Sequence, residues 1–177
     1  FSGGTTSAGP TNWTAFEVPD ITWSVVSGVL QFSLASPQTT ASGEARVSQA
    51  TGRALPTGAP VLAQFDLGNS STARKRVRVR LTDEDLSDLT ECTFWLAAGA
   101  PLRTYQVRGH ASEVWSNASL FFYAETPGLD GGNYRLDNVS VKYVPGQQAL
   151  WTECLDPTRP TPPGGTDSAN LVANGDF

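Results

Sequence analysis

An arginine ladder is the first feature of the chain that could do chemistry. The stretch RKRVRVRL at residues 74–81 places an arginine at every second position. Side chains alternate between the two faces of a β-strand, so one face would carry all four arginines: Arg74, Arg76, Arg78 and Arg80. Guanidinium groups bind carboxylates through paired hydrogen bonds, so this ladder could grip an acidic polysaccharide. We favour the alternative of a solvated face whose arginines pair with acids on an adjoining strand, because the acidic loop DEDLSD follows at residues 83–88.

The two cysteines predict a disulfide. Cys92 and Cys154 are the only cysteines, and neither a CxxC motif nor a nearby histidine pair accompanies them. A zinc site is therefore not expected, and one disulfide formed in an oxidising compartment is the better interpretation. Whether the bond lies within one chain or between neighbouring chains stays open at this point.

The inventory for catalysis is small. His110 is the only histidine and lies in the polar stretch Gly-His-Ala-Ser, which predicts a surface loop. The sequence contains no Ser/His/Asp arrangement of known type, no phosphate-binding glycine-rich loop and no HExxH motif. We therefore expect that the protein is not an enzyme.

Aromatic residues suggest a different kind of site. The chain has five tryptophans and four tyrosines, and flat rings with a polar rim suit the stacking of sugar rings. Trp13, Trp23 and Trp151 lie near turns or in a proline-rich segment, so we expect them to be exposed and name them as candidates for glycan contact. Trp95 and Trp115 lie in or beside apolar strands, and we expect them in the core.

Composition and hydrophobic periodicity indicate an all-β fold. The net charge of −5 argues against nucleic acid as a partner, because affinity for duplexes comes mainly from basic residues. No apolar run approaches the roughly 18 residues of a membrane span. Period-2 patterns recur at close spacing, and we find no convincing helix. They predict an antiparallel β-sandwich (jelly roll), with strands within residues 21–34, 44–50, 61–68, 74–81, 90–97, 102–109, 118–125 and 133–144.

Three parts follow one another along the chain. Residues 1–145 form the predicted sandwich, and residues 146–169 form a Pro/Gly-rich linker without strand pattern. Its segment PTRPTPPGG should be extended and semi-rigid. Residues 170–177, NLVANGDF, return to strand character. Because no methionine occurs and position 1 is Phe, we expect a processed product, an engineered fragment or one unit of something longer.

Several stretches resemble a known family. FSGG…NWTAF at the start, WSVVSGVLQFSL…VLAQFDLG…RKRVRVRLTD in the middle and NYRLDNVSVKYV at the end resemble the carbohydrate-binding-module-like, galactose-binding-type jelly rolls of bacterial extracellular proteins. Members of that family open with a strand like NLVxNGDF and close with one containing the equivalent of residues 137–140. The resemblance implies the jelly-roll fold over about four-fifths of the chain.

The resemblance also implies a candidate cation site. Binders of this type commonly carry a glutamate after the opening strand that helps to hold a structural calcium, and Ser2 stands there instead. Asp137, with Asp176 of a neighbouring strand, remains the candidate pair for calcium. Four Asn-x-Ser/Thr triplets, which suit a secreted protein, begin at Asn12, Asn69, Asn117 and Asn138.

The position of the NLVANGDF segment carries the functional hypothesis. In folds of the resembled type, the first strand pairs with the last, and here that strand stands at the other end of the chain. It could complete its own domain, insert into the next subunit, or begin the next domain of a tandem array. The predicted inter-unit strand comprises Asn170, Leu171, Val172, Ala173, Asn174, Gly175, Asp176 and Phe177. The predicted acceptor edge comprises Tyr134, Leu136, Val139, Val141 and Tyr143.

We therefore predict a non-catalytic, structural repeat of an extracellular or cell-surface filament. Its partners would be identical copies of itself, because a head-to-tail contact does not close and forms a filament. The alternative is a carbohydrate-binding module of a secreted glycan-active protein, with exposed tryptophans in contact with a polysaccharide.

Overall fold

The computed structural model describes residues 12–17, 19–39, 43–145 and 152–159. Eleven strands occur there, and no helix does. The chain therefore has no helix in these ranges that could cross a membrane. The strands are β1 Thr14–Phe16, β2 Ile21–Val26, β3 Val29–Leu34, β4 Arg46–Ala50, β5 Pro60–Asn69, β6 Lys75–Thr82, β7 Leu89–Leu96, β8 Arg103–His110, β9 Ser119–Ala124, β10 Tyr134–Tyr143 and β11 Glu153–Leu155.

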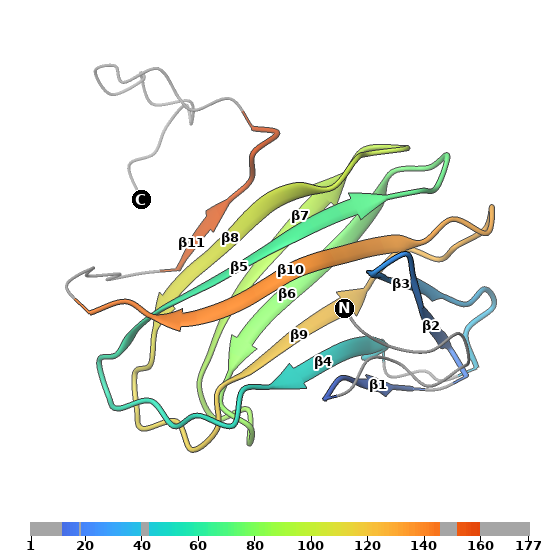
Figure 1. Cartoon of the computed structure of the whole chain (residues 1–177). Coiled ribbons are helices and arrows are strands. Elements are labelled where there is room, and N and C mark those ends of the chain that lie inside the picture. The colour runs from blue at the N-terminus through green and yellow to red at the C-terminus, as the bar shows by residue number, and fades with distance from the viewer. Residues whose placement is uncertain (1–11, 18, 40–42, 146–151, 160–177) are drawn as a thin grey trace, which may run out of the picture.

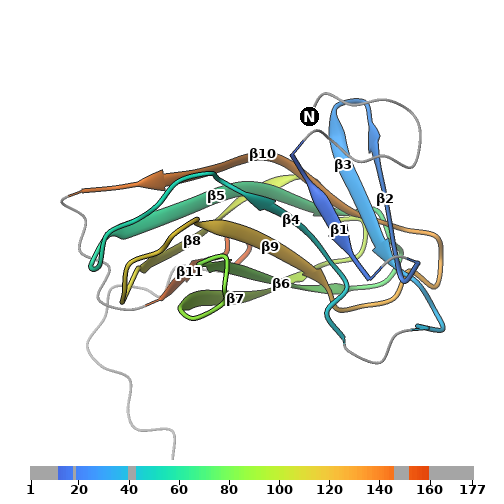
Figure 2. The same ribbon diagram turned by 90° about the horizontal axis from the view of Figure 1, so that it is seen from below.

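The strands form two antiparallel sheets, as the sequence predicts. Sheet A has the order β1-β4-β9-β6-β7, and sheet B has the order β11-β8-β5-β10-β3-β2 (Figure 1). Figure 2 shows β1, β2 and β3 together at one end of the molecule, with the long strands β5 and β10 side by side. Neighbours in the sheets are mostly not neighbours in sequence, which is the property of a jelly roll rather than a meander.

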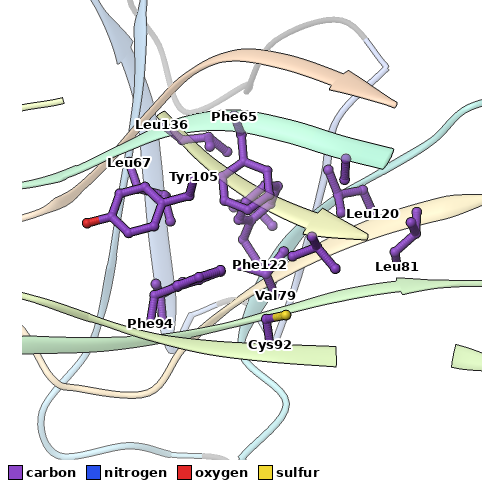
Figure 3. Close-up of a cluster of buried hydrophobic side chains, with 14 of the residues drawn as sticks. Phe65, Leu67, Val79, Leu81, Cys92, Phe94, Tyr105, Leu120, Phe122 and Leu136 are labelled. Carbon is purple, nitrogen blue, oxygen red and sulfur yellow. The ribbon is translucent and has the colours of Figure 1, made fainter. Parts of the chain in front are cut away.

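Alternating apolar residues of both sheets build the core between them. In β5, for example, Val61, Ala63, Phe65 and Leu67 are buried, while the residues between them are half-buried. Figure 3 shows the central cluster, in which Phe65 lies edge-on to Phe122 with ring centroids 5.0 Å apart. Full burial of such a side chain contributes about 1.5–3 kcal/mol, so this cluster is the main source of stability.

Local signals predicted most boundaries correctly. The turn between β2 and β3 has Ser27 and Gly28 at φ of 52° and 82°, as a two-residue hairpin turn requires. The linker prediction is wrong at one place. Residues 153–155, within the segment expected to lack strands, form β11, which pairs with β8 at the edge of sheet B. The domain boundary at residue 145 otherwise stays a prediction.

The predicted disulfide is confirmed, and it lies within one chain. Cys92 of β7 and Cys154 of β11 are bonded, with their Cα atoms 5.6 Å apart. The bond therefore connects an edge strand of sheet A to an edge strand of sheet B. It closes one side of the sandwich covalently.

The acidic loop serves the fold by accepting hydrogen bonds. Oδ2 of Asp88 accepts the indole N–H of buried Trp115 at 2.7 Å and the backbone N–H of Ser112 at 2.6 Å. Oδ1 of Asp83 accepts the backbone N–H of Asn117 at 3.0 Å. Burial alone would raise the pKa of both aspartates, but the hydrogen bonds outweigh it and the pKa of each is lowered. Both carboxylates are thus held ionised by the loop that they organise.

Candidate functional site

The strand register aligns chemically related side chains across the outer face of sheet A. Phe16 pairs with Arg46, Arg46 with Tyr123, and Tyr123 with Arg78. One row of side chains therefore runs from β1 through β4 and β9 to β6. A second row places Phe121 beside Arg80. We call this surface the arginine–aromatic face: Phe16, Glu44, Arg46, Arg74, Arg76, Arg78, Arg80, Glu91, Trp95, Phe121, Tyr123 and Glu125.

Tyr123 is the centre of this face. The guanidinium carbons of Arg78 and Arg80 lie 4.1 Å and 5.1 Å from the centroid of its ring. Arg46 lies 5.6 Å from the same centroid and 4.2 Å from that of Phe16. Cations over aromatic faces are attracted by the ring quadrupole, so the guanidinium planes and the rings hold one another in place.

Carboxylates complete the network. Glu125 lies 2.6 Å from Nε of Arg78, and Glu91 lies 2.8 Å from Nε of Arg80. Glu44 also approaches Arg78, at 3.8 Å. The favoured interpretation of the ladder, in which its arginines pair with acids on an adjoining strand, is thus confirmed for Arg78 and Arg80, which both contact Glu91 of β7. The acids do not come from the loop at residues 83–88, on which the interpretation was based. This pairing does not test whether the ladder binds an acidic polysaccharide, because paired guanidinium groups keep further N–H donors.

The exposed end of the face lies over β6 and β7. Trp95 is 40% exposed, and the guanidinium carbon of Arg74 lies 4.0 Å from its ring centroid. Arg76 lies 5.8 Å from the same ring and is paired with Glu125. Arg74 has no acidic partner among the residues that the structure describes. This end therefore offers a flat ring and a cation to solvent.

Three buried polar atoms of this face, namely Nε of Arg46, Nε of Arg78 and the hydroxyl of Tyr123, have no hydrogen-bond partner in the described part of the chain, although Nε of Arg78 is ion-paired with Glu125. Burial raises the pKa of Tyr123, against the opposing effect of Arg80. The hydroxyl of Tyr123 is thus a neutral, buried group on a ring that is covered by the guanidinium groups of Arg46, Arg78 and Arg80.

The tryptophan predictions need correction. Trp13 is only 8% exposed and packs against Phe122, with ring centroids 6.0 Å apart, so it is a core residue rather than an exposed contact. Trp23 is partly buried and packs against the core. Trp151 lies outside the described residues. Trp95, expected in the core, is exposed instead, because it lies on the outward-facing positions of β7, whereas Trp115 is buried as expected.

The predicted acceptor edge lies on β10 and is narrower than expected. Strand β3 already pairs with Tyr134–Leu136, so Tyr134 and Leu136 are not open for a further strand. Beyond them, Val139, Val141 and Tyr143 line a groove along the side of β10 that faces away from β5. This remaining part of the edge has no strand beside it in the described chain.

The cation prediction is untested. The carboxylate of Asp137 accepts the backbone N–H of Asn138 at 2.9 Å, and Asp176 lies outside the described residues. In the ranges that the structure describes, no three His, Cys, Asp or Glu side chains are grouped closely enough to hold a metal. Of the four glycosylation triplets, Asn69 is buried and donates to Ala73 and Ala97.

Sequence reasoning missed the two central aromatic residues of the face. Phe121 and Tyr123 stand in SLFFYA, where alternation buries Leu120 and Phe122 on one side and turns the other two rings outward. The signal that could have indicated them is the run of aromatic residues at adjacent positions, which places rings on both faces of the strand. What it could not indicate is the register that places Tyr123 opposite Arg78.

Comparisons with known proteins agree on the fold. No protein-family model matches the chain, and no curated protein matches it significantly. Among solved structures, a CBM4 module gives a TM-score of 0.58 at 14% identity, over 76% of this chain and 96% of that chain. The CBM22-1 xylan-binding domain of Paenibacillus barcinonensis Xyn10C gives 0.55 at 14% identity, over 78% of this chain and 90% of that chain.

A third neighbour is an enzyme. The arabinose-bound α-L-arabinofuranosidase MgGH51 gives a TM-score of 0.56 at 16% identity, over 74% of this chain but only 23% of that chain. The likeness thus covers a minor part of the glycosidase. The chain has the jelly-roll fold of carbohydrate-binding modules, as the sequence resemblance implied. At these identities the likeness concerns the fold alone.

Proposed function

We propose that the protein is a non-catalytic carbohydrate-binding module that binds a polysaccharide on the arginine–aromatic face. The observation that carries the proposal is the solvent side of sheet A, where exposed Phe16 and Trp95 flank a row of guanidinium groups. Charged side chains alone would keep this face soluble, so the exposed aromatic rings of Phe16 and Trp95 favour a role in binding. The fold shared with the CBM4 module and with the xylan-binding CBM22-1 domain supports the same function.

The face has the groups that a sugar chain needs. The exposed ring of Trp95 can pack against the apolar face of a pyranose, while Arg74 and Arg76 beside it donate hydrogen bonds to hydroxyl or carboxylate oxygens. Glu91 and Glu125 accept hydrogen bonds from sugar hydroxyls, and the arginines keep these carboxylates in place. Five arginines against three glutamates on an otherwise acidic chain favour a polysaccharide with carboxylate groups.

Secretion is part of the proposal. A disulfide within the chain is typical of proteins that fold in an oxidising compartment, and polysaccharides of cell walls and matrices are met there. We therefore place the protein outside the cell or on its surface.

Affinity gel electrophoresis tests the binding. The full chain is run through gels that contain neutral xylan or carboxylated polygalacturonate, at low and high salt. We expect retardation by the acidic polymer that weakens with salt, and a loss of about tenfold in affinity for Trp95→Ala or Arg74→Ala. Arg135→Ala is the matched control, since Arg135 lies on β10 of sheet B. Equal loss in the control, or no retardation by either polymer, would contradict the proposal.

A second candidate function is the head-to-tail array predicted from the sequence. The specific observation in its favour is the part of β10 beyond Leu136, which has a strand on one side only in the described chain. Mass measured by light scattering over a range of concentrations tests it. Self-association supports the array, and a constant mass of 18.8 kDa contradicts it.

A further inference from the structure

One edge of β10 lacks a partner strand over part of its length in the described chain. β10 pairs with β5 at Tyr134–Asp137 and at Ser140–Tyr143, with a register shift between these two parts, but with β3 only at Tyr134–Leu136. In Figure 1, β2 and β3 cover the start of β10, and its arrowhead end runs on well beyond them. Unpaired N–H and C=O groups of an edge strand are a template for another strand. Residues 137–143 present such a template over seven positions.

Three adjoining pockets make this edge a groove rather than a plain border. The first holds about 290 Å³ and lies between Trp13, Gln49 and Val139. The second, of about 200 Å³, shares Gln49 and Val139 with it and adds Val141. The third, of about 240 Å³, is the most apolar and continues past Val141 to Tyr143.

The walls of the groove come from both sheets. One wall is β10, and the other is formed by the end of β4 and the segment that follows it, with Thr51, Leu55 and Pro56. Val139 and Val141 are only partly buried although they pack against the core, and Tyr143 is 52% exposed. The apolar lining thus continues the core outward, to a position where one more strand of sheet B would cover it.

Residues 170–177 have the sequence that fits this position. NLVANGDF has Leu171, Ala173 and Phe177, with Gly175, on one side of a strand. The other side carries three polar residues, at 170, 174 and 176, and Val172. Seven of the segment's eight residues, 171–177, match the seven positions of the open edge. In an antiparallel register with Leu171 opposite Tyr143, Ala173 lies opposite Val141. Both apolar pairs then face the groove.

This orientation also fixes where the segment ends. An antiparallel strand that starts beside Tyr143 finishes beside Asp137, and the pocket at that end is lined by Trp13, the residue before β1. The inserted segment therefore finishes next to the first strand that the structure describes in the receiving copy.

The described chain ends far from the groove. β11 is separated from β10 by β8 and β5, so the groove lies about 19 Å from β11 at the usual strand spacing. β11 also runs antiparallel to β10, so a spacer from the same chain would have to cross sheet B and return to the Tyr143 end. Residues 160–169 include Pro160, Pro162 and Pro163, which favour extended chain over such a reversal.

We propose that the groove beside Val139, Val141 and Tyr143 receives residues 170–177 of a second copy of this chain as an antiparallel strand of sheet B. The inference rests on the second candidate function and names the contact through which the copies join. It is independent of glycan binding, because the arginine–aromatic face belongs to the outer side of sheet A.

Disulfide trapping tests the contact directly. Full-length Tyr143→Cys and Leu171→Cys variants, one of them carrying a fluorescent tag, are mixed and oxidised. Because paired strands bring these positions together, we expect a mixed dimer in about tenfold higher yield than with the control pair Leu129→Cys and Leu171→Cys. Leu129 is 82% exposed and lies in the loop before β10, at the far end from Tyr143. Val141→Cys with Ala173→Cys is the second pair, for the same register.

Two outcomes overturn the proposal. Equal yields for both test pairs and the control mean that the segment does not occupy the groove. An internally crosslinked monomer from the double variant Tyr143→Cys/Leu171→Cys, without mixed dimers from the single variants, means that the segment closes on its own domain.

Light scattering distinguishes a failure of the proposed contact from a failure of self-association as such. We expect the full chain and Ser168→Asp to associate, and Leu171→Asp, which adds the same charge within the strand, to stay at 18.8 kDa. Association of Leu171→Asp at the wild-type level overturns the contact and leaves an array formed through another surface. Absence of association in the wild-type chain overturns both.

Discussion

Asp88 gives the sharpest test of the fold as described. Its Oδ2 alone accepts both the indole N–H of Trp115 and the backbone N–H of Ser112. Asp88→Ala removes the acceptor and leaves the N–H of a fully buried tryptophan without a partner. Asp88→Asn keeps a carbonyl oxygen that can accept both bonds and removes only the charge. The two substitutions therefore separate the hydrogen bonds from the ionisation.

The expected magnitudes follow from this geometry. An unpaired buried donor costs about 1–3 kcal/mol, and hydrogen bonds to charged groups contribute about 1.5–3 kcal/mol. The N–H of Ser112 is exposed and regains water, so we count mainly the bond to Trp115. We expect a loss of about 2–3 kcal/mol in the free energy of unfolding for Asp88→Ala. Asp88→Asn should lose about 1 kcal/mol, because only the assistance of the charge is lost.

Urea unfolding followed by tryptophan fluorescence and by circular dichroism measures both variants. Asp85→Ala is the control, since this exposed loop residue accepts one hydrogen bond within its own turn. Equal losses for Asp88→Ala and Asp88→Asn would refute the reasoning, because the charge rather than the buried indole would then determine the stability. A loss below about 0.5 kcal/mol for Asp88→Ala would refute it as well, since that is the range of ordinary surface substitutions.

Two further predictions concern the same domain. Reduction of the Cys92–Cys154 bond, which closes a loop across 62 positions, should lower the free energy of unfolding by up to about 4 kcal/mol. That loss corresponds to a fall in Tm of up to about 8–16 °C by calorimetry; no fall would contradict it. Asp83 and Asp88 have folded-state pKa values below their unfolded ones, so their contribution is present above about pH 4 and is lost as the pH falls through the folded values. Tm should be similar at pH 7 and 5 and fall below pH 4, and less steeply in Asp88→Asn.

Local alternation carried most of the fold prediction. The strands β2 to β10 are all long enough for period-2 patterns to be read, and the Ser27-Gly28 turn marks its hairpin by residue type alone. β11 could not be found in this way. Its three residues are defined by pairing with β8 and by the bond from Cys154 to Cys92, and neither contact has a local signal.

To predict the candidate site, one would have to know the pairing register of the strands, which no local sequence pattern gives. Whether Tyr123 lies opposite Arg78 or a valine is decided by one residue of slippage between β9 and β6. The core pairs Phe122–Val79 and Leu120–Leu81 fix this register.

Trp13 and Trp95 were assigned to the wrong environments for other reasons. Trp13 precedes β1, and its burial comes from packing against Phe122 of β9, a contact that has no local signal. Trp95 alternates with the buried Cys92, Phe94 and Leu96, so the period-2 pattern of β7 places it outward.

The two proposed activities can operate in one molecule because they use different surfaces of β4. Arg46 turns to the outer side of sheet A, whereas Gln49 lines the groove beside β10. A strand inserted in that groove would extend sheet B and leave the arginine–aromatic face uncovered.

An array joined in this way would repeat the face once per unit. A polysaccharide that bound each face weakly would then bind the array through many sites at once, with an overall affinity far above that of one domain. Binding measured on Leu171→Asp, which should stay monomeric, against binding by the associated wild-type chain separates the affinity of one face from the effect of assembly.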